Sequence, residues 1–308
     1  DTDRSRGLGD VYKRQKQILK TKAGKTYYSL TLQDKTGTAD GKIWELNNGI
    51  ANFEPMDYIH CEGMVTSFQG NLQMNISRVR ISDEGEYDPA DYVPCTNKDV
   101  GEMFSRILKY VASVQNKYLR KILEMYFVEN KEFVDAFKKH SAAKSVHHGF
   151  MGGLLEHTLS VTDMCQYFAE HYPMIHRDLL ITAALFHDMG KIQEISDFPM
   201  NDYTDDGQLL GHIYIGARCM ENAAAQIPNF PPKLKNELVH CILAHHGKME
   251  FGSPKVPAIM EAMALHMADN ADAKLQTLTE VFTQAGDNMG WLGFNRMFES
   301  NLRKTSEE

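Results

Sequence analysis

Residues 184–191, ALFHDMGK, place a histidine and an aspartate side by side at the end of an apolar run, before a glycine and a lysine. A single His-Asp pair is weak evidence of function. Four other apolar, helix-like segments carry the same residue types: His157 in GGLLEHT, His212 in LLGHIYIG, His245 and His246 in LAHHGKMEFG, and Asp269 in ALHMADNADA. Isolated charges in apolar surroundings cost roughly several kcal/mol unless they are paired or bound to metal. We therefore expect these side chains to share a partner.

Imidazole nitrogens combined with carboxylate oxygens favour Mn, Fe, Zn, Ni or Co over Ca or Mg. Neighbouring helix residues point in directions about 100° apart, so His187 and Asp188 can face different ions, and Asp188 has two oxygens with which to bridge them. We expect two ions, the first held by His157, His187, Asp188 and Asp269 and the second by Asp188, His212 and His245. Two ions about 3.5–4 Å apart activate water and hold a phosphate oxygen, which predicts phosphoester hydrolysis.

The residues after the His-Asp pair fit the same chemistry. Lys191 is expected to meet the substrate phosphate as a point charge, and Gly190 to end the preceding helix. His148 is favoured over its neighbour His147 as a proton donor to the leaving oxygen or as a phosphate contact. A polar pair at a helix start is an equal alternative for these two histidines.

Two further histidines have open roles. His246 either binds substrate or completes the second metal site, and an equal alternative is that it contacts a metal ligand without binding the ion itself. His266 lies one helical turn before Asp269, and a core or supporting role is favoured for it.

The chain divides by its hydrophobic pattern. Residues 16–82 alternate as short strands with Gly-centred turns, for example TYYSLTLQD, and resemble an OB-fold whose first strand is cut short. Residues 83–97 are acidic and contain two prolines, as is typical of a linker. From residue 98 to 308 the period is helical, including an amphipathic helix expected at 291–302. The predicted fold is therefore multidomain: a small N-terminal β-barrel followed by an all-α domain.

Residues 1–15 are expected to stand apart from this fold. The segment SRGLGDVYKRQ resembles the in-frame translation of a transposon-based sequencing adapter. We therefore predict that residues 1–15 are an assembly artefact and disordered, and that the first strand of the barrel is shortened as a result.

The barrel is a candidate surface for nucleic acid. Bases stack on exposed aromatic rings while lysines follow the backbone. The candidates on or beside the strands are Tyr28, Lys42, Trp44 and Phe68. Packing inside the barrel is an equally good explanation for Tyr28 and Trp44.

The ordered pattern H…HD…H…HH…D with HDxGK resembles the HD-domain metallophosphohydrolases. With an OB-like module before it, and with SVHHGFMGGLLEHTLSV, FHDMGKIQE, GQLLGHIYIG and AHHGKMEFGSP in place, the chain is similar to YhaM-type 3'-5' exoribonucleases of Gram-positive bacteria over nearly all of residues 16–300. The resemblance implies a two-metal, Mn²⁺-type hydrolase that shortens single-stranded RNA from its 3' end, with DNA left open as a substrate. It also implies that the OB module holds the RNA.

Composition limits the alternatives. The 308 residues carry a net charge of −8, and residues 16–82 hold more Lys and Arg than Asp and Glu, so the acidic excess lies in residues 83–308. Such a charge argues against simple phosphate binding unless metal ions reverse it locally. Five scattered cysteines and no apolar run of about 18 residues predict a reduced, cytoplasmic protein without a membrane span. The segment 291–302 leaves a homo-oligomer open.

Two other functions remain as alternatives. HD sites act on many phosphoesters, so the substrate could be a small nucleotide or a cyclic dinucleotide, with a regulatory OB module. A non-enzymatic nucleic-acid-binding protein is disfavoured by the apparently complete ligand set and the acidic charge.

Overall fold

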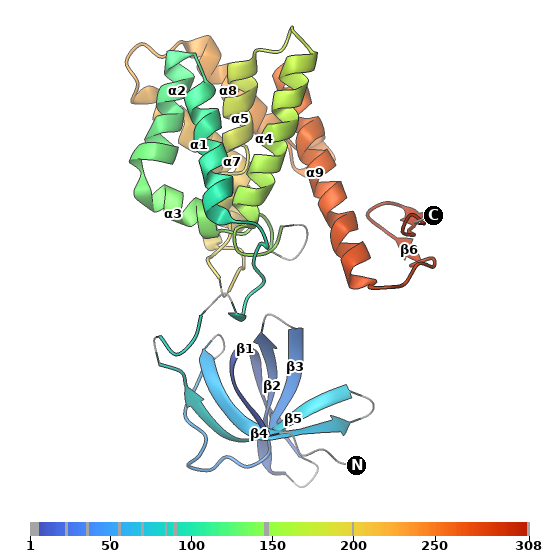
Figure 1. The fold of residues 1–308 in the computed structure, drawn as a ribbon. Coiled ribbons are helices and arrows are strands. Elements are labelled where there is room, and N and C mark those ends of the chain that lie inside the picture. Colours follow the sequence, from blue (N-terminus) through green and yellow to red (C-terminus); the bar gives the residue numbers. More distant parts are fainter. Residues whose placement is uncertain are drawn as a thin grey trace. The chain divides into compact units, whose positions relative to one another are not determined.

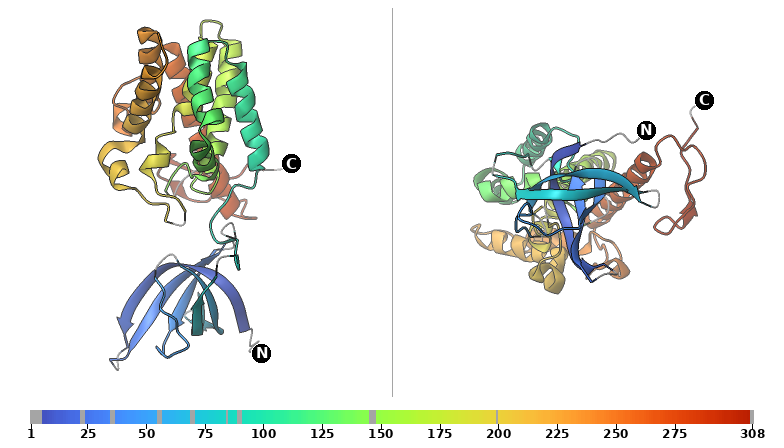
Figure 2. Two further views of the ribbon diagram at one scale, coloured as in Figure 1. Left: turned by 90° about the vertical axis from the view of Figure 1, so that its left-hand side faces the viewer. Right: turned by 90° about the horizontal axis from the view of Figure 1, so that it is seen from below.

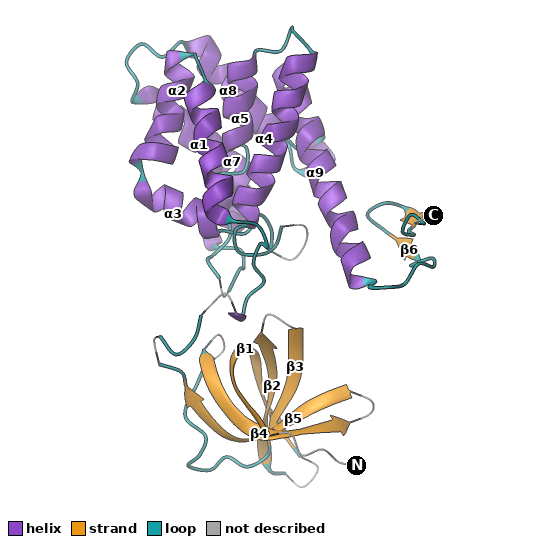
Figure 3. Cartoon of the chain, viewed as in Figure 1, coloured by secondary structure: helices purple, strands orange, loops and turns teal. Residues whose placement is uncertain are grey.

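The computed structural model describes residues 6–21, 24–34, 37–54, 57–68, 71–83, 85–88, 91–144, 148–198 and 200–306. The chain forms two compact units with a boundary between Cys95 and Thr96. The first unit is built from strands and the second from helices (Figure 3). Among the helices of the described ranges, none has the length and apolar character that crossing a membrane requires.

The first unit is a five-stranded barrel of the OB type (Figure 1). Its strands are β1 (Arg6–Lys20), β2 (Thr26–Asp34), β3 (Gly37–Ile43), β4 (Tyr58–Phe68) and β5 (Asn71–Ile81). The hydrogen-bonded order is β1-β2-β3-β5-β4, and all pairs are antiparallel except β3 with β5. The strands curve around a shared interior (Figure 2).

The interior of the barrel is filled by one face of each strand. Leu30 and Leu32 alternate with polar residues along β2 and are 1% and 2% exposed. They pack with Ile43, Ile59 and Phe53, which come from the other strands and from the loop after β3. The predicted alternation in TYYSLTLQD is therefore the pattern that forms this core.

The N-terminal segment differs from expectation. Residues 6–15, predicted to be disordered, lie in β1, and the first strand runs over 15 residues instead of being cut short. Its first half, Arg6–Tyr12, pairs with β4, and its second half pairs with β2. The physical reason is that strand pairing uses backbone groups, which every sequence other than proline supplies. Residues 1–5 lie outside the described residues.

The second unit is helical. Its longer elements are α1 (Val100–Ser113), α2 (Lys117–Glu124), α3 (Lys131–Lys139), α4 (Gly153–His171), α5 (Arg177–Phe186), α7 (Asp205–Ala225), α8 (Pro232–Ala244) and α9 (Met260–Gln284). Short elements complete it: a π-helical turn η2 (Met125–Glu129), α6 (Lys191–Glu194), a 3-10 turn η3 (Met249–Phe251), and the strands β6 (Phe294–Asn295) and β7 (Ser300–Asn301).

Helix α5 is the centre of this unit. Every residue from Leu179 to Phe186 is buried, so the helix is apolar on all sides. It packs on α4, α8 and α9, as Figure 1 shows. The buried helix ends directly at His187 and Asp188, which places this pair inside the unit.

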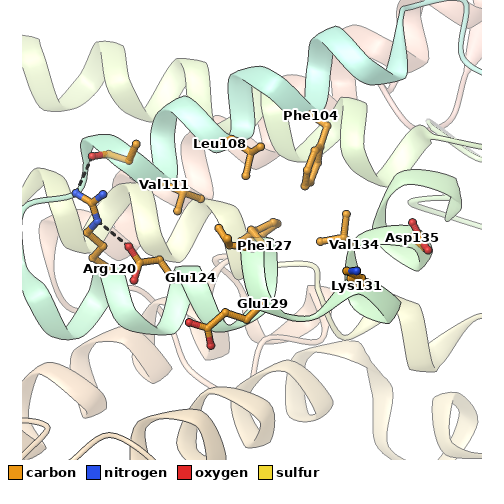
Figure 4. Close-up of a pocket in the computed structure, with 12 residues that line it drawn as sticks. Phe104, Leu108, Val111, Arg120, Glu124, Phe127, Glu129, Lys131, Val134 and Asp135 are labelled. Atoms are coloured by element: carbon orange, nitrogen blue, oxygen red, sulfur yellow. Dashed lines mark hydrogen bonds and ion pairs between the residues drawn. The ribbon is translucent and has the colours of Figure 1, made fainter.

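The π-helical turn contributes to the same hydrophobic core. Phe127 packs toward α1 and α3, where a cavity of about 740 Å³ is lined mainly by apolar side chains (Figure 4). Arg120 closes one end by bonding to Glu124, at 3.0 Å, and to the carbonyl of Ala112. Among the described residues no histidine lines this cavity, so it lacks the imidazole donors of the predicted metal centre.

The C-terminal segment also differs from expectation. Residues 291–302 were predicted to form an amphipathic helix, but they form the hairpin of β6 and β7. Gly293 and Glu299 have φ angles of 91° and 49°, which do not fit a right-handed helix. Trp291 and Phe294 are 69% and 66% exposed, so no core holds the segment in a helix.

The burial of α5 makes a stability prediction. Leu180→Ala removes a fully buried side chain, and we expect it to lower the free energy of unfolding by about 2–5 kcal/mol. Urea denaturation followed by helical circular dichroism measures the change. Leu275→Ala on α9, where the side chain is 62% exposed, is the control and should cost less than about 0.5 kcal/mol.

Candidate active site

Five helical elements bring the predicted histidines and aspartates together. His157 lies in the first turns of α4, His187 and Asp188 directly follow α5, and Asp269 lies on α9. His212 follows Gly211, whose φ of 72° and ψ of 152° break the helical path of α7. His245 and His246 directly follow α8.

The first cluster consists of His157, His187, Asp188 and Asp269. The Nε2 atom of His157 lies 3.2 Å from Nε2 of His187, 3.4 Å from Oδ2 of Asp188 and 3.3 Å from Oδ1 of Asp269. His187 Nε2 lies 3.5 Å and 3.9 Å from the same two carboxylate oxygens. Atoms bound about 2.1 Å from one ion lie roughly 3.0–3.5 Å from each other, so this spacing suits a shared cation.

The second cluster consists of Asp188, His212, His245 and His246. Oδ1 of Asp188 lies 3.5 Å from Nε2 of His212 and 3.6 Å from Nε2 of His245. A ring nitrogen of His246 completes a three-histidine group whose donor atoms lie within 4.8 Å of one another. Asp188 thus directs one oxygen to each cluster.

Buried atoms without hydrogen-bond partners mark the second cluster as a site for a ligand. Asp188 Oδ1, His212 Nε2 and His245 Nε2 find no such partner in the described part of the chain. Buried polar atoms are nearly always satisfied, and a divalent ion at this point would satisfy all three. The residues present therefore fit a divalent metal, and their donor set suits a transition metal.

In three of the candidate ligand histidines, the ring nitrogen opposite the one that would bind metal is bonded within the protein. His187 Nδ1 donates to the carbonyl of Ala184 at 2.8 Å, and His245 Nδ1 donates to that of Ile242 at 2.7 Å. His212 Nδ1 lies 3.0 Å from Oε1 of Glu194. These bonds fix the tautomer in which Nε2 is free to bind a cation.

The environment sets the protonation of these groups. Burial lowers the pKa of His187 to about 4, so its ring is neutral at physiological pH. Burial and the neighbouring His245 likewise lower the pKa of His246 to about 4. Burial raises the pKa of Asp188, but the charge of Lys191 and the neighbouring histidines together outweigh this effect and hold that pKa well below its ordinary value. A neutral imidazole and an ionised carboxylate are the forms that bind metal, so His187, His246 and Asp188 are in the ligand form.

Lys191 lies beside the metal donors. Its Nζ is 2.6 Å from Oδ2 of Asp188, and its side chain is 13% exposed. It lines a cavity of about 480 Å³ together with His157, His212 and Asp269. A cation at the wall of this cavity can contact an anionic substrate.

Gly190 has a different role from the one expected. Its φ of −64° and ψ of −20° are helical, so it does not end a helix by its conformation. A Cβ at this position would overlap the carbonyl oxygen of His212 and approach the backbone of Gly216. Glycine is required because the backbones of α6 and α7 touch there, and this contact positions His212.

Asp272 is a functional candidate that the sequence reasoning missed. Its Oδ2 accepts from Nδ1 of His157 at 2.7 Å and from Nε2 of His148 at 2.9 Å, and its Oδ1 accepts from the Ser160 hydroxyl. These hydrogen bonds outweigh burial and hold the pKa of Asp272 far below its ordinary value. The spacing of Asp272 from Asp269, one helical turn, was the available signal.

His148 is buried at this network. It is 2% exposed and has a φ of 59°, an uncommon backbone conformation for a residue other than glycine. Its Nδ1 lacks a hydrogen-bond partner among the described residues. His147 lies outside the described residues.

His246 and His266 each bond to a backbone carbonyl near the site. His246 Nδ1 donates to the carbonyl of Phe251 at 2.8 Å, and His266 Nδ1 donates to that of His245 at 3.0 Å. Both rings line the cavity. The ring of His266 lies against Gly247, where a Cβ would overlap it.

The candidate nucleic-acid residues of the barrel differ in exposure. Trp44 is 45% exposed, stacks on Tyr27 with ring centroids 4.6 Å apart, and donates from Nε1 to Asn75. Tyr28 instead packs against the barrel core, and Lys42 is 16% exposed and bonds to the Ser29 hydroxyl. The placement of the Phe68 side chain lies outside what the structure describes. The exposed aromatic ring is thus that of Trp44, and it stacks on the partly buried Tyr27, a partner that the sequence analysis missed.

The contact at Gly190 generates a prediction. We expect Gly190→Ala to separate α6 from α7, to displace His212, and to reduce bound metal from two equivalents to one. Elemental analysis of the purified protein measures this number. Gly216→Ala, where a Cβ would lie 3.6 Å from Ile242 in ordinary contact, is the control. Two retained equivalents in a folded Gly190→Ala protein would contradict the assignment.

The hydrogen bonds of Asp272 lead to a second prediction about metal binding. Asp272→Asn keeps the shape but removes the charge that orients His157, and we expect metal affinity to fall about 10–100-fold. Titration against a metallochromic chelator gives the dissociation constants. Asp163→Asn on the same α4 as His157, where the carboxylate binds Arg106 and Tyr110 instead, should leave metal affinity unchanged.

Comparison with known proteins gives this site a family. The HD domain family matches residues 154–274. Three proteins described as 3'-5' exoribonuclease YhaM are similar over most of the chain. The protein from Geobacillus sp. (strain WCH70) is 32% identical, covering 87% of this chain and 83% of its own length; that of Bacillus subtilis (strain 168) is 32% identical, covering 83% and 81%. That of Listeria innocua is 33% identical, covering 84% and 82%.

A solved structure also matches the N-terminal part. The second OB-fold domain of replication protein A from Methanococcus maripaludis is 19% identical, with a TM-score of 0.21, and covers 27% of this chain and 90% of its own.

HD domains are divalent-metal-dependent hydrolases, in keeping with the His/Asp clusters described above. With sequence identity above 30% along most of its length, the chain belongs to the family of YhaM 3'-5' exoribonucleases.

Proposed function

We propose that this protein is a metal-dependent 3'-5' exoribonuclease that hydrolyses the phosphodiester bonds of single-stranded RNA with two divalent ions, most readily Mn²⁺. Its family and its HD domain support a phosphodiester-cleaving hydrolase acting on nucleic acid. The observation that carries the two-ion part is the division of the Asp188 oxygens between two donor sets.

The bound ions supply Lewis acidity and a water of lowered pKa. In this proposal His157, His187 and Asp269 complete the first site with Asp188, and the three histidines of the second cluster complete the other. The chain fixes these donors through their opposite ring nitrogens, so little reorganisation is needed when substrate enters.

Two further side chains act on the substrate itself. Lys191 contacts a non-bridging phosphate oxygen and offsets charge that develops there. His148, buried beside the first cluster, holds the proton that the leaving oxygen receives. Burial lowers the pKa of Lys191, but the carboxylates of Asp188 and Asp269 outweigh it and raise that pKa, which keeps the side chain charged.

The barrel supplies a surface for the RNA strand in this proposal. The half-exposed ring of Trp44, which stacks on the partly buried Tyr27, offers a face on which a base can lie, and Lys42 lies two residues before Trp44 near the end of β3. Stacking is tolerant of base identity, as an exonuclease requires. Single-stranded RNA is the proposed substrate. Single-stranded DNA of the same sequence is the control substrate for preference between RNA and DNA.

A small nucleotide is the second candidate substrate. The cavity of about 480 Å³ at the donor clusters falls within the usual range for small-molecule pockets. A substrate panel on the intact chain separates the two readings. Turnover of cyclic dinucleotides with no shortening of RNA would replace the nuclease proposal.

The bridging role of Asp188 makes the central prediction. With Mn²⁺ and 5'-labelled single-stranded RNA, we expect a ladder of shortened products from the wild-type protein. Asp188→Ala should remove both ions and lower the rate by at least about 10³-fold, since both sites lose a ligand. Asp206→Ala, an exposed acidic residue in the first turn of α7, should retain both properties. Two bound equivalents in Asp188→Ala would disprove the bridge.

A further inference from the structure

Two aromatic side chains line the cavity beside the donor clusters and have no role in the proposed hydrolysis. Tyr203 and Phe251 both line the cavity of about 480 Å³ whose wall also includes His157, His212, His246 and Asp269. They are 45% and 55% exposed, although aromatic rings usually bury most of their surface. Each therefore presents an open face close to the ions' donors.

Both residues are anchored by their backbone to the second cluster. The carbonyl of Phe251 accepts from Nδ1 of His246 at 2.8 Å. Tyr203 forms an isolated antiparallel bridge with Ile195, the residue after the Glu194 that orients His212. The backbones of Tyr203 and Phe251 are thus bonded to segments that hold histidines of the second cluster.

A lysine accompanies each ring. Lys144 Nζ lies 5.8 Å from the centre of the Tyr203 ring, and Lys248 Nζ lies 5.1 Å from that of Phe251. Both lysines are about half exposed or more and pair with exposed acidic residues, from which a phosphate can draw them. Aromatic faces combined with nearby cations are the chemistry that binds single-stranded nucleic acid.

Small side chains leave room between these groups. Ala142, Ala143 and Ala273 line the same cavity, and Asn270, next to Asp269, offers an amide. A planar base can therefore enter without displacing a large side chain. No carboxylate other than those of Glu194 and Asp269 lines this cavity within the described ranges.

We propose that Tyr203 and Phe251 form a base-stacking clamp for the last nucleotides at the 3' end of the RNA. The clamp holds the terminal bases by their faces, and Lys144 and Lys248 meet the flanking phosphates. This orientation presents the terminal phosphodiester to the donor clusters. The proposal rests on the exoribonuclease function and assigns to that site its substrate-positioning residues.

The test compares two substrates and four proteins. The substrates are a 5'-labelled 12-nucleotide RNA and the same RNA with abasic riboses at the last two 3' positions. The proteins are the full-length wild type, Tyr203→Leu, Phe251→Leu and the control Tyr167→Leu, which changes a 61% exposed tyrosine on α4 outside the cavity. KM, kcat and metal content are measured for each at one salt concentration.

We expect each clamp variant to raise KM for intact RNA roughly 5- to 100-fold, with metal content unchanged and kcat within about twofold. Abasic RNA should show a raised KM with the wild type, and the variants should raise it no further. Equal KM values for both RNAs with the wild type, or equal effects of the variants on both, would overturn the clamp.

If the protein is not an exoribonuclease, the experiment gives a result that differs from failure of the clamp. In that case the wild type leaves intact RNA uncut although its metal is bound. The clamp is then tested with an RNA that carries 2-aminopurine at its 3' terminal position. The fluorescence of this base is measured when the RNA is mixed with the protein at low temperature, because stacking on an aromatic ring quenches it. Quenching that is lost in Phe251→Leu supports the clamp, and absence of quenching with the wild type overturns it.

Discussion

The carboxylate of Asp188 is the constraint on which the rest of the helical unit depends. It is 2% exposed, and a buried charge is costly unless it is closely paired. One of its oxygens faces His157 and His187, the other faces His212 and His245, and Lys191 lies 2.6 Å away. Five elements, α4 to α8, must therefore bring one of their residues, or the residue that follows them, within a few ångströms of this carboxylate, and this requirement constrains how they pack.

Close backbone approach makes this convergence possible. Gly190 lets α6 touch α7 at His212, and Gly207 lets the start of α7 touch Glu194, the residue that orients the same histidine. Gly153 similarly allows the first turn of α4 to meet the carbonyl of His148. Each contact replaces a side chain by backbone, so the donors are positioned by main-chain packing, which is stiffer than long side chains.

Sequence reasoning reached the donor residues because their types are unusual where they occur. An imidazole or carboxylate in an apolar helical stretch needs a partner, and several such stretches predict one shared site. Asp272 was within reach, one turn from Asp269, but Glu194 was not, because only the tertiary packing of α6 against the kink in α7 brings it to His212. Tyr203 was hidden for the same reason, since a loop bridge to Ile195 places it.

The errors in the fold prediction have the opposite origin. Residues 6–15 were set aside for their resemblance to an adapter, yet strand pairing depends on backbone groups and not on what encoded them. The segment 291–302 has helical periodicity, but without a surface to bury its apolar face that periodicity stabilises nothing, and Gly293 turns the chain instead. Periodicity predicts a helix only where something covers it.

Charge connects the metal centre to the substrate. The acidic excess of the chain lies outside residues 16–82, so the unit that must cut a polyanion repels it at long range. Two divalent ions bound at the clusters would add four positive charges at the cavity, where Lys191 is already held. Metal binding and RNA binding are then coupled, because each is more favourable once the other is in place. In this arrangement two bound ions would reverse the sign of the charge at the donor clusters, so RNA would be attracted to the cavity beside them although the helical unit as a whole is acidic.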